Sequence, residues 1–227
     1  MSVKTTHRRL ARCLATVLAA SLLAGCTIPY SDHPLSDNKT STVDDRLIGR
    51  WLQIEDDEEE PKSDEARAAE AGKSFDFMTV GLKKNGQTTM VAVHIELGDD
   101  GELSMERNFF YTTTINKQHY LSWQQKDEDD KKTIKYVIAS YTLDANGLFT
   151  TYLMDNDKVV AAIEQGRVDG EIDITIEQVN GMQKETKTAH LTASPEQLRR
   201  FLLETGTDCF DDEHPMKLQF LGRQNRQ

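Results

Sequence analysis

The segment TIKYVIASYTL, residues 133–143, carries the pattern that decides the fold. Its side chains alternate between two faces, and both faces are apolar: Ile134 and Ile138 lie on one, Val137 and Tyr141 on the other. Period-two alternation is typical of a β-strand, and a strand that is apolar on both faces is buried on both sides. We therefore expect residues 133–143 to form a central strand.

Residues 90–97, 171–179 and 216–221 predict further strands around this central one. In residues 171–179 the isoleucines alternate with polar residues, as in a sheet with one buried and one solvated face. These isoleucines are Ile172, Ile174 and Ile176. Residues 90–97 likewise gather their large aliphatic side chains on one face: Val91, Val93, Ile95 and Leu97.

Short polar turns separate the strands. Asparagine-glycine dipeptides are typical of two-residue hairpin turns, because a type I′ turn needs two residues with positive φ. They occur at Asn85-Gly86, Asn146-Gly147 and Asn180-Gly181. Successive hairpins form an antiparallel meander, which hides its edges by closing into a barrel or by stacking as a sandwich. We therefore expect a mainly β fold, and the hairpin order is compatible with both architectures.

Two or three short helices interrupt the strand pattern. An Ala- and Glu-rich stretch at residues 63–71 predicts one, and the spacing of apolar side chains in residues 156–165 predicts another. The clearest helix begins at Ser194, a favourable N-cap. It has Pro195 at the first helical position and Gln197 at the capping-box position.

The first 25 residues have the composition of a removable export signal. A basic segment precedes an apolar run, residues 13–25, which ends in small side chains. A helix of about 13 residues rises only about 20 Å, whereas the hydrocarbon core of a bilayer is about 30 Å thick. We therefore expect a cleaved signal rather than a permanent transmembrane helix.

The end of this run, Leu23-Ala24-Gly25-Cys26, resembles the lipobox of bacterial lipoproteins. The resemblance implies cleavage between Gly25 and Cys26 and acyl chains, such as palmitate, on Cys26 that anchor the protein to a membrane. Thr27 follows the cysteine. By analogy with enteric-type bacteria, the absence of Asp at this position favours the outer membrane, with the protein facing the periplasm.

The chain then divides into a signal peptide over residues 1–25, a flexible polar tether over residues 26–42 and a single β-rich globular domain over residues 43–227. Without the signal, 23 basic and 38 acidic residues give a net charge of −15. So acidic a surface argues against a nucleic-acid partner. Cys13 leaves with the signal, so Cys209 has no partner for an intrachain disulfide.

The tripeptide Gly49-Arg50-Trp51 opens the β-rich region. It resembles the Gly-x-Trp signature in the first strand of lipocalins, in which the Trp side chain plugs one end of the barrel. The resemblance implies an up-and-down barrel that holds a small apolar ligand.

Residues that could carry chemistry do not form a catalytic or metal-binding pattern. Asp208 and Asp211 beside Cys209 would raise the pKa of the thiol, so pairing with His190 or His214 predicts no nucleophile. His94 is interpreted as a solvent-facing strand residue, and the acidic runs at 55–60 and 127–130 lack the spacing of a calcium loop. We expect no metal and no cofactor.

These observations favour a non-enzymatic lipoprotein that binds a small apolar ligand or an envelope protein. Two alternatives stay open: an envelope hydrolase whose site is dispersed over several strands, and a structural envelope protein without a ligand. Barrel and sandwich, and the oligomeric state, also stay open.

We predict that Cys26→Ser abolishes acylation and releases the protein from membranes, because the substituted side chain offers no sulfur for diacylglycerol transfer. Incorporation of labelled palmitate measures this directly. A variant that still takes up the label would contradict the assignment.

Overall fold

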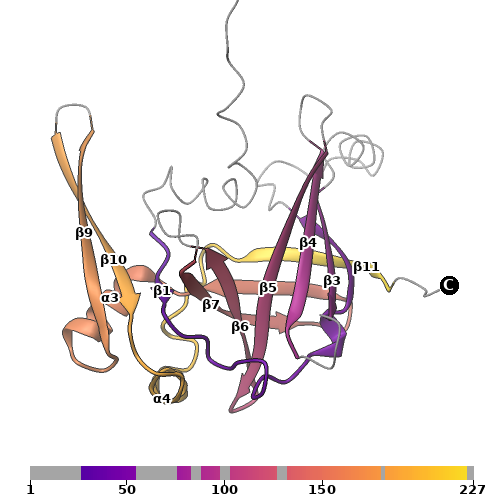
Figure 1. The fold of residues 1–227 in the computed structure, drawn as a ribbon, viewed down its shortest axis with the longest axis horizontal. Coiled ribbons are helices and arrows are strands. Elements are labelled where there is room, and N and C mark those ends of the chain that lie inside the picture. The colour runs from indigo at the N-terminus through magenta and orange to yellow at the C-terminus, as the bar shows by residue number, and fades with distance from the viewer. Residues whose placement is uncertain are drawn as a thin grey trace, which may run out of the picture.

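Six stretches of the chain are described by a computed structural model, which Figure 1 shows: residues 27–54, 76–82, 88–97, 103–126, 132–179 and 182–223. Within them the elements are β1 (Tyr30–Ser31), the 3₁₀ turn η1 (Asp45–Leu47), β2 (Gly49–Ile54), β3 (Asp76–Leu82), β4 (Met90–Leu97), β5 (Leu103–Ile115), β6 (Gln118–Lys126), β7 (Ile134–Leu143), β8 (Leu148–Leu153), α3 (Asn156–Glu164), β9 (Gly170–Val179), β10 (Met182–Leu191), α4 (Pro195–Thr205) and β11 (Met216–Gly222).

Eight of these strands close into a barrel. Strands β2 to β8 follow one another as a meander, and β11 pairs with both β8 and β2 to complete the ring. Every neighbouring pair in the ring is antiparallel. The mainly β prediction is confirmed, and of its two architectures the structure has the closed barrel, which fits the lipocalin-like up-and-down arrangement.

Strand β7 is the central strand that residues 133–143 predict. It pairs with β6 over residues 134–141, with β8 over residues 139–143 and with β1 at Tyr136. Ala139 and Tyr141 lie in the hydrophobic core inside the barrel and Val137 lines its cavity, whereas Ile138 belongs to a second core outside it. Each apolar face of this strand therefore packs in a different core.

The second core lies between the barrel and the elements inserted between β8 and β11. This insertion consists of α3, β9, β10 and α4, which stand beside the barrel in Figure 1. It buries Val159 of α3 and Leu198 of α4. Both predicted helices are confirmed: Asp155 caps α3, and Ser194 caps α4 with Gln197 completing the capping box.

The prediction that residues 26–42 form a flexible tether is wrong for the part that the structure describes. Tyr30–Ser31 form β1, which pairs in parallel with β10 and antiparallel with β7. Leu35 is fully buried in the second core; its N–H donates to Ser122 Oγ at 2.9 Å, and its carbonyl oxygen accepts from Arg199 Nε at 2.6 Å. Polar composition did not mean disorder here, because the polar groups bond to the folded domain.

The β9–β10 hairpin extends away from the barrel (Figure 1). Ile172 packs against the second core, but Ile174 and Ile176 are 57% and 62% exposed, so the predicted buried face of residues 171–179 is wrong beyond Ile172. Helix α3 covers only the base of the hairpin, where Asn156 hydrogen-bonds to the backbone of β10. Alternation shows that two faces differ, not that another element covers the apolar one.

The hairpin turns differ in detail from the prediction. The turn at Asn146-Gly147 exists, but Gly147 alone has a positive φ, 80°, and the Asp144 side chain accepts backbone hydrogen bonds within the turn. Two successive positive φ values occur instead at Asn116-Lys117, which joins β5 to β6. A lysine stands there where a type I′ turn favours glycine, and the dipeptide pattern therefore missed it.

Several predictions fall outside the described stretches: the helix at residues 63–71, the turns at Asn85-Gly86 and Asn180-Gly181, both acidic runs, and the export signal with Leu23, Ala24, Gly25 and Cys26. Within the described stretches, neither helix is long and apolar enough to cross a membrane.

We predict that Leu35→Ala lowers the free energy of unfolding by about 3 kcal/mol, the typical cost of truncating a fully buried leucine. Leu203→Ala is the matched control, since Leu203 is 58% exposed on α4 and should cost no more than about 0.5 kcal/mol. Denaturant titration measures both. Equal unfolding free energies for wild type and Leu35→Ala would restore the tether interpretation.

Candidate binding pocket inside the barrel

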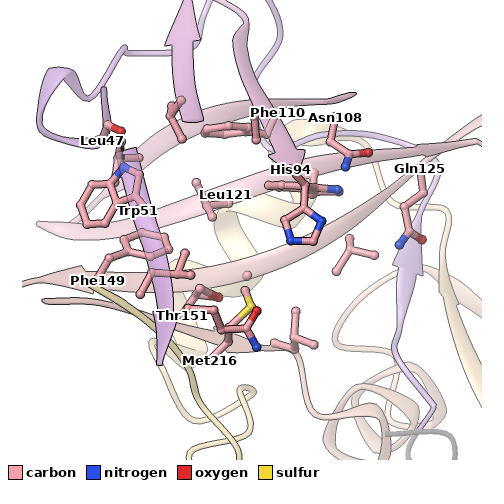
Figure 2. A pocket seen from close by; sticks show the side chains of 18 of the residues that line it. Leu47, Trp51, His94, Asn108, Phe110, Leu121, Gln125, Phe149, Thr151 and Met216 are labelled. Atoms are coloured by element: carbon pink, nitrogen blue, oxygen red, sulfur yellow. Dashed lines mark hydrogen bonds between the residues drawn. The ribbon is translucent and has the colours of Figure 1, made fainter. Parts of the chain in front are cut away.

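The barrel encloses a cavity of about 140 Å³. Alternate side chains of a barrel strand point inward. On β4 the lining residues are Ala92 and His94, and on β6 they are Leu121, Trp123 and Gln125. The wall is almost entirely apolar, and Figure 2 shows its side chains converging on the cavity from strands on all sides.

One end of the cavity is formed by partly exposed residues, which we call the rim: Ile28, Gln53, His94, Gln125 and Met216. Because neighbouring strands are antiparallel, the C-terminal halves of β2, β4 and β6 reach the same end of the barrel as the N-terminal half of β11. The rim residues lie on these halves, with Ile28 added from the segment before β1. The rim is therefore the end at which the cavity opens.

Aromatic side chains and η1 close the opposite end. The indole N–H of the buried Trp51 donates to the carbonyl oxygen of Leu47 at 2.8 Å, and the rings of Phe149 and Phe220 lie 5.7 and 5.0 Å from its ring. The backbone at Gly49 lies so close to the Phe220 ring that a Cβ at this position would overlap it.

A polar network stabilises the closed end from outside. Asp44 accepts hydrogen bonds from Arg46 Nε at 2.8 Å and from the Tyr141 hydroxyl at 2.9 Å, while the His119 ring stacks on Tyr141 at 5.3 Å. Burial raises the pKa of Asp44, but the hydrogen bonds from Arg46 and Tyr141 outweigh burial and hold it below its ordinary value. Burial, reinforced by the charge of Asp44, raises the pKa of Tyr141. This arrangement fixes η1 over the closed end.

Two residues that line the cavity carry buried hydrogen-bond donors without partners. Within the described part of the chain, neither the buried side-chain NH₂ of Asn108 nor the buried indole N–H of Trp123 has a hydrogen-bond partner. Sequence analysis missed both residues. The inward direction of Asn108 can be recognised only when the register of β5 is known. Trp123 resembles any other core aromatic residue until the hydrogen-bond partner of its indole N–H is sought in the structure.

The prediction that His94 faces solvent is wrong, because His94 lines the cavity at the rim. The inward face of β4 carries Met90, Ala92 and His94, whereas Val91 and Val93 lie partly buried on the other face. The large aliphatic side chains of β4 did not mark its inward face. Small or polar side chains face inward instead, because large ones would fill the cavity.

Cys209 is a buried thiol of the second core. Burial raises its pKa, which lowers the fraction of reactive thiolate. The two histidines considered as its base bond elsewhere: His190 Nε2 lies 2.7 Å from Asp32, and His214 Nδ1 lies 3.0 Å from Asp211. Neither histidine is therefore paired with Cys209 in the structure.

Within the described stretches, no three His, Cys, Asp or Glu side chains form a group that could hold a metal ion. The chain matches no protein-family model, no curated protein and no solved structure. The structure thus defines the class by architecture: an antiparallel eight-stranded barrel with an apolar cavity that is closed at one end.

We predict that Asp44→Asn lowers stability at pH 7 by about 2 kcal/mol, the scale of hydrogen bonds to a charged group, and flattens the acid limb of the stability curve. The folded pKa of Asp44 is depressed, so its contribution is complete above the unfolded pKa of about 3.9. It is lost as the pH falls through the folded pKa.

Denaturant titrations from pH 7 to pH 2 measure this dependence. Tyr141→Phe removes one of the four donor groups that bond Asp44 and should reproduce part of the change. Parallel stability curves for wild type and Asp44→Asn over the whole range would contradict the prediction.

Proposed function

We propose that this chain is a membrane-anchored lipoprotein whose barrel binds a small apolar ligand. The observation that carries the binding part is the apolar cavity between the closed end at Trp51 and the rim. Protein interiors are normally packed as densely as organic crystals, so a cavity of this kind is a feature that needs a reason. Ligand sites in barrels lie in this position, at the mouth and interior.

The size of the cavity sets the size of the ligand. An eight-stranded barrel has an interior that side chains can fill or that can hold one small ligand. Here Ala92 and Ala139 line the wall with the smallest apolar side chains and so contribute to the space. An apolar protein cavity of about 150 Å³ binds benzene, so a cavity of about 140 Å³ is suited to a molecule of similar size or to the end of a longer one.

The proposed anchor lies close to the rim. The lipobox-like segment ends at Cys26, and Ile28, two residues later, lines the cavity. Two residues of extended chain span at most about 7 Å. Acyl chains on Cys26 would therefore bring the open end of the barrel to the membrane surface, and an apolar ligand could enter from the bilayer without crossing much water. The absence of Asp after Cys26 supports, by analogy with enteric-type bacteria, the periplasmic face of the outer membrane as the proposed location.

We predict that the barrel binds toluene saturably and that Ala139→Leu weakens this binding at least about tenfold, because the larger side chain fills the cavity. Ala161→Leu is the matched control: it adds the same volume on α3, outside the cavity lining. Both tryptophans line the cavity, so the two indole N–H signals in an NMR titration report its occupation.

Two results would overturn the binding proposal. One is the absence of saturable shifts in the wild-type barrel, and the other is equal affinity of wild type and Ala139→Leu. The anchoring part is tested separately by palmitate labelling of Cys26→Ser, for which Cys209→Ala is a control because that thiol is buried.

A further inference from the structure

We infer that the pocket is built for a neutral ligand with an apolar body and a carbonyl-type oxygen, which accepts hydrogen bonds from Asn108 and Trp123. This inference rests on the proposed binding function and names the chemistry of its ligand. It depends on the position, burial and lack of partners of these two donors.

Asn108 and Trp123 lie on the neighbouring strands β5 and β6 and line the same cavity. Trp123 on β6 pairs directly with Phe110 on β5, and the two rings stack with centroids 5.5 Å apart and planes 9° from parallel. Asn108 precedes Phe110 by two residues and therefore lies on the same face of β5, just beyond the last β5–β6 pair, where it pairs with Ala92 of β4. Figure 2 shows the Asn108 side chain directed into the pocket, toward the side where His94 and Gln125 lie.

The missing partners distinguish these two donors from the other fully buried side-chain nitrogen and oxygen atoms of the described residues. More than nine-tenths of buried polar groups in proteins are hydrogen-bonded, since an unpaired buried donor is costly. Asn108 is only 8% exposed. Trp51 lines the same cavity, yet its indole N–H is satisfied by the carbonyl oxygen of Leu47. The barrel thus bonds one indole internally and leaves the other, together with an amide, for an acceptor in the cavity.

The lining indicates that this acceptor is neutral. Among the described residues that line the cavity there is no Lys, Arg, Asp or Glu, and His94 at the rim is their one titratable side chain. A carboxylate placed between two neutral donors would lose its hydration without gaining a counter-charge. A ketone, ester or amide oxygen has two lone pairs and can accept from both donors at a far lower desolvation cost.

The test compares three probes of similar size: acetophenone, which has a neutral acceptor, ethylbenzene, which has none, and benzoate, which is anionic at pH 7. Binding is measured by calorimetry to the wild-type barrel and to Asn108→Leu and Trp123→Phe. Each substitution removes one hydrogen-bond donor and puts an apolar side chain of related shape in its place. Thr150→Val is the control, because Thr150 lies on β8 beside a lining residue but does not itself line the cavity.

We expect each donor substitution to lower the ratio of acetophenone to ethylbenzene affinity about tenfold, as loss of one hydrogen bond implies, and Thr150→Val to leave it unchanged. Asn108→Leu should also raise the melting temperature of the empty barrel, since it removes a buried group without a partner; this measurement shows that the variant is folded. Benzoate should bind more weakly than acetophenone.

NMR gives a signature that a purely structural role would not produce. Acetophenone should move the indole proton of Trp123 downfield as its hydrogen bond forms, whereas ethylbenzene should not. The indole proton of Trp51 serves as the internal reference, because it is already bonded to Leu47.

The outcomes separate this inference from the binding proposal. If toluene and ethylbenzene bind but the affinity ratio is the same in wild type and both donor variants, the cavity binds apolar molecules and the acceptor inference is wrong. Tighter binding of benzoate than of acetophenone would also overturn it. If no probe binds, the proposed function itself fails.

Discussion

The burial of β7 on both faces is the constraint on which the rest of the structure depends. Its inward side chains, among them Ala139 and Tyr141, complete the barrel core, while Ile138 belongs to the second core together with residues of α3 and α4. Hydrophobic burial is the main favourable term in folding, so neither core can be removed without exposing one face of this strand. The barrel, the helical insertion and β1 are held together because they share this one strand.

The two ends of the barrel differ in whether their buried polar groups have hydrogen-bond partners. At the closed end every named group is paired: Trp51 donates to Leu47, and Asp44 accepts from Arg46 and Tyr141. Farther toward the rim, Asn108 and Trp123 line the apolar cavity and carry buried donors that have no partner among the described residues. A sequence that satisfies local rules elsewhere and breaks them at one place is expected to do so where function requires it. The unpaired donors therefore locate the site more sharply than the cavity volume does.

Sequence patterns predicted the elements whose signals are local. The two apolar faces of residues 133–143 identified β7, and Ser194 with Gln197 identified the start of α4, because alternation and capping depend on neighbouring residues alone. Sequence patterns could not show which element covers the apolar face of a strand. The isoleucine stripe of β9 resembled a buried face, although Ile174 and Ile176 extend beyond the helix that covers the base of the hairpin.

The candidate site was less accessible to prediction than the fold. His94, Asn108 and Trp123 lie on three different strands, and their convergence depends on the register of β4, β5 and β6. Leu35 was missed for a related reason: the polar segment around it is ordered by bonds to Ser122 and Arg199, which are distant in the sequence. Contacts between distant segments carry the information that composition and spacing lack.

The position of β11 has a consequence for how this chain reaches its folded form. The last strand completes the ring between β2, the first strand of the barrel, and β8. Until it is in place, both neighbours expose rows of unpaired backbone groups, which are templates for pairing with other chains, and such long-range pairing is slow. A premature stop codon ahead of Met216 would thus yield an open, self-associating sheet rather than a slightly smaller barrel. Such an open sheet would be prone to aggregate in the cell.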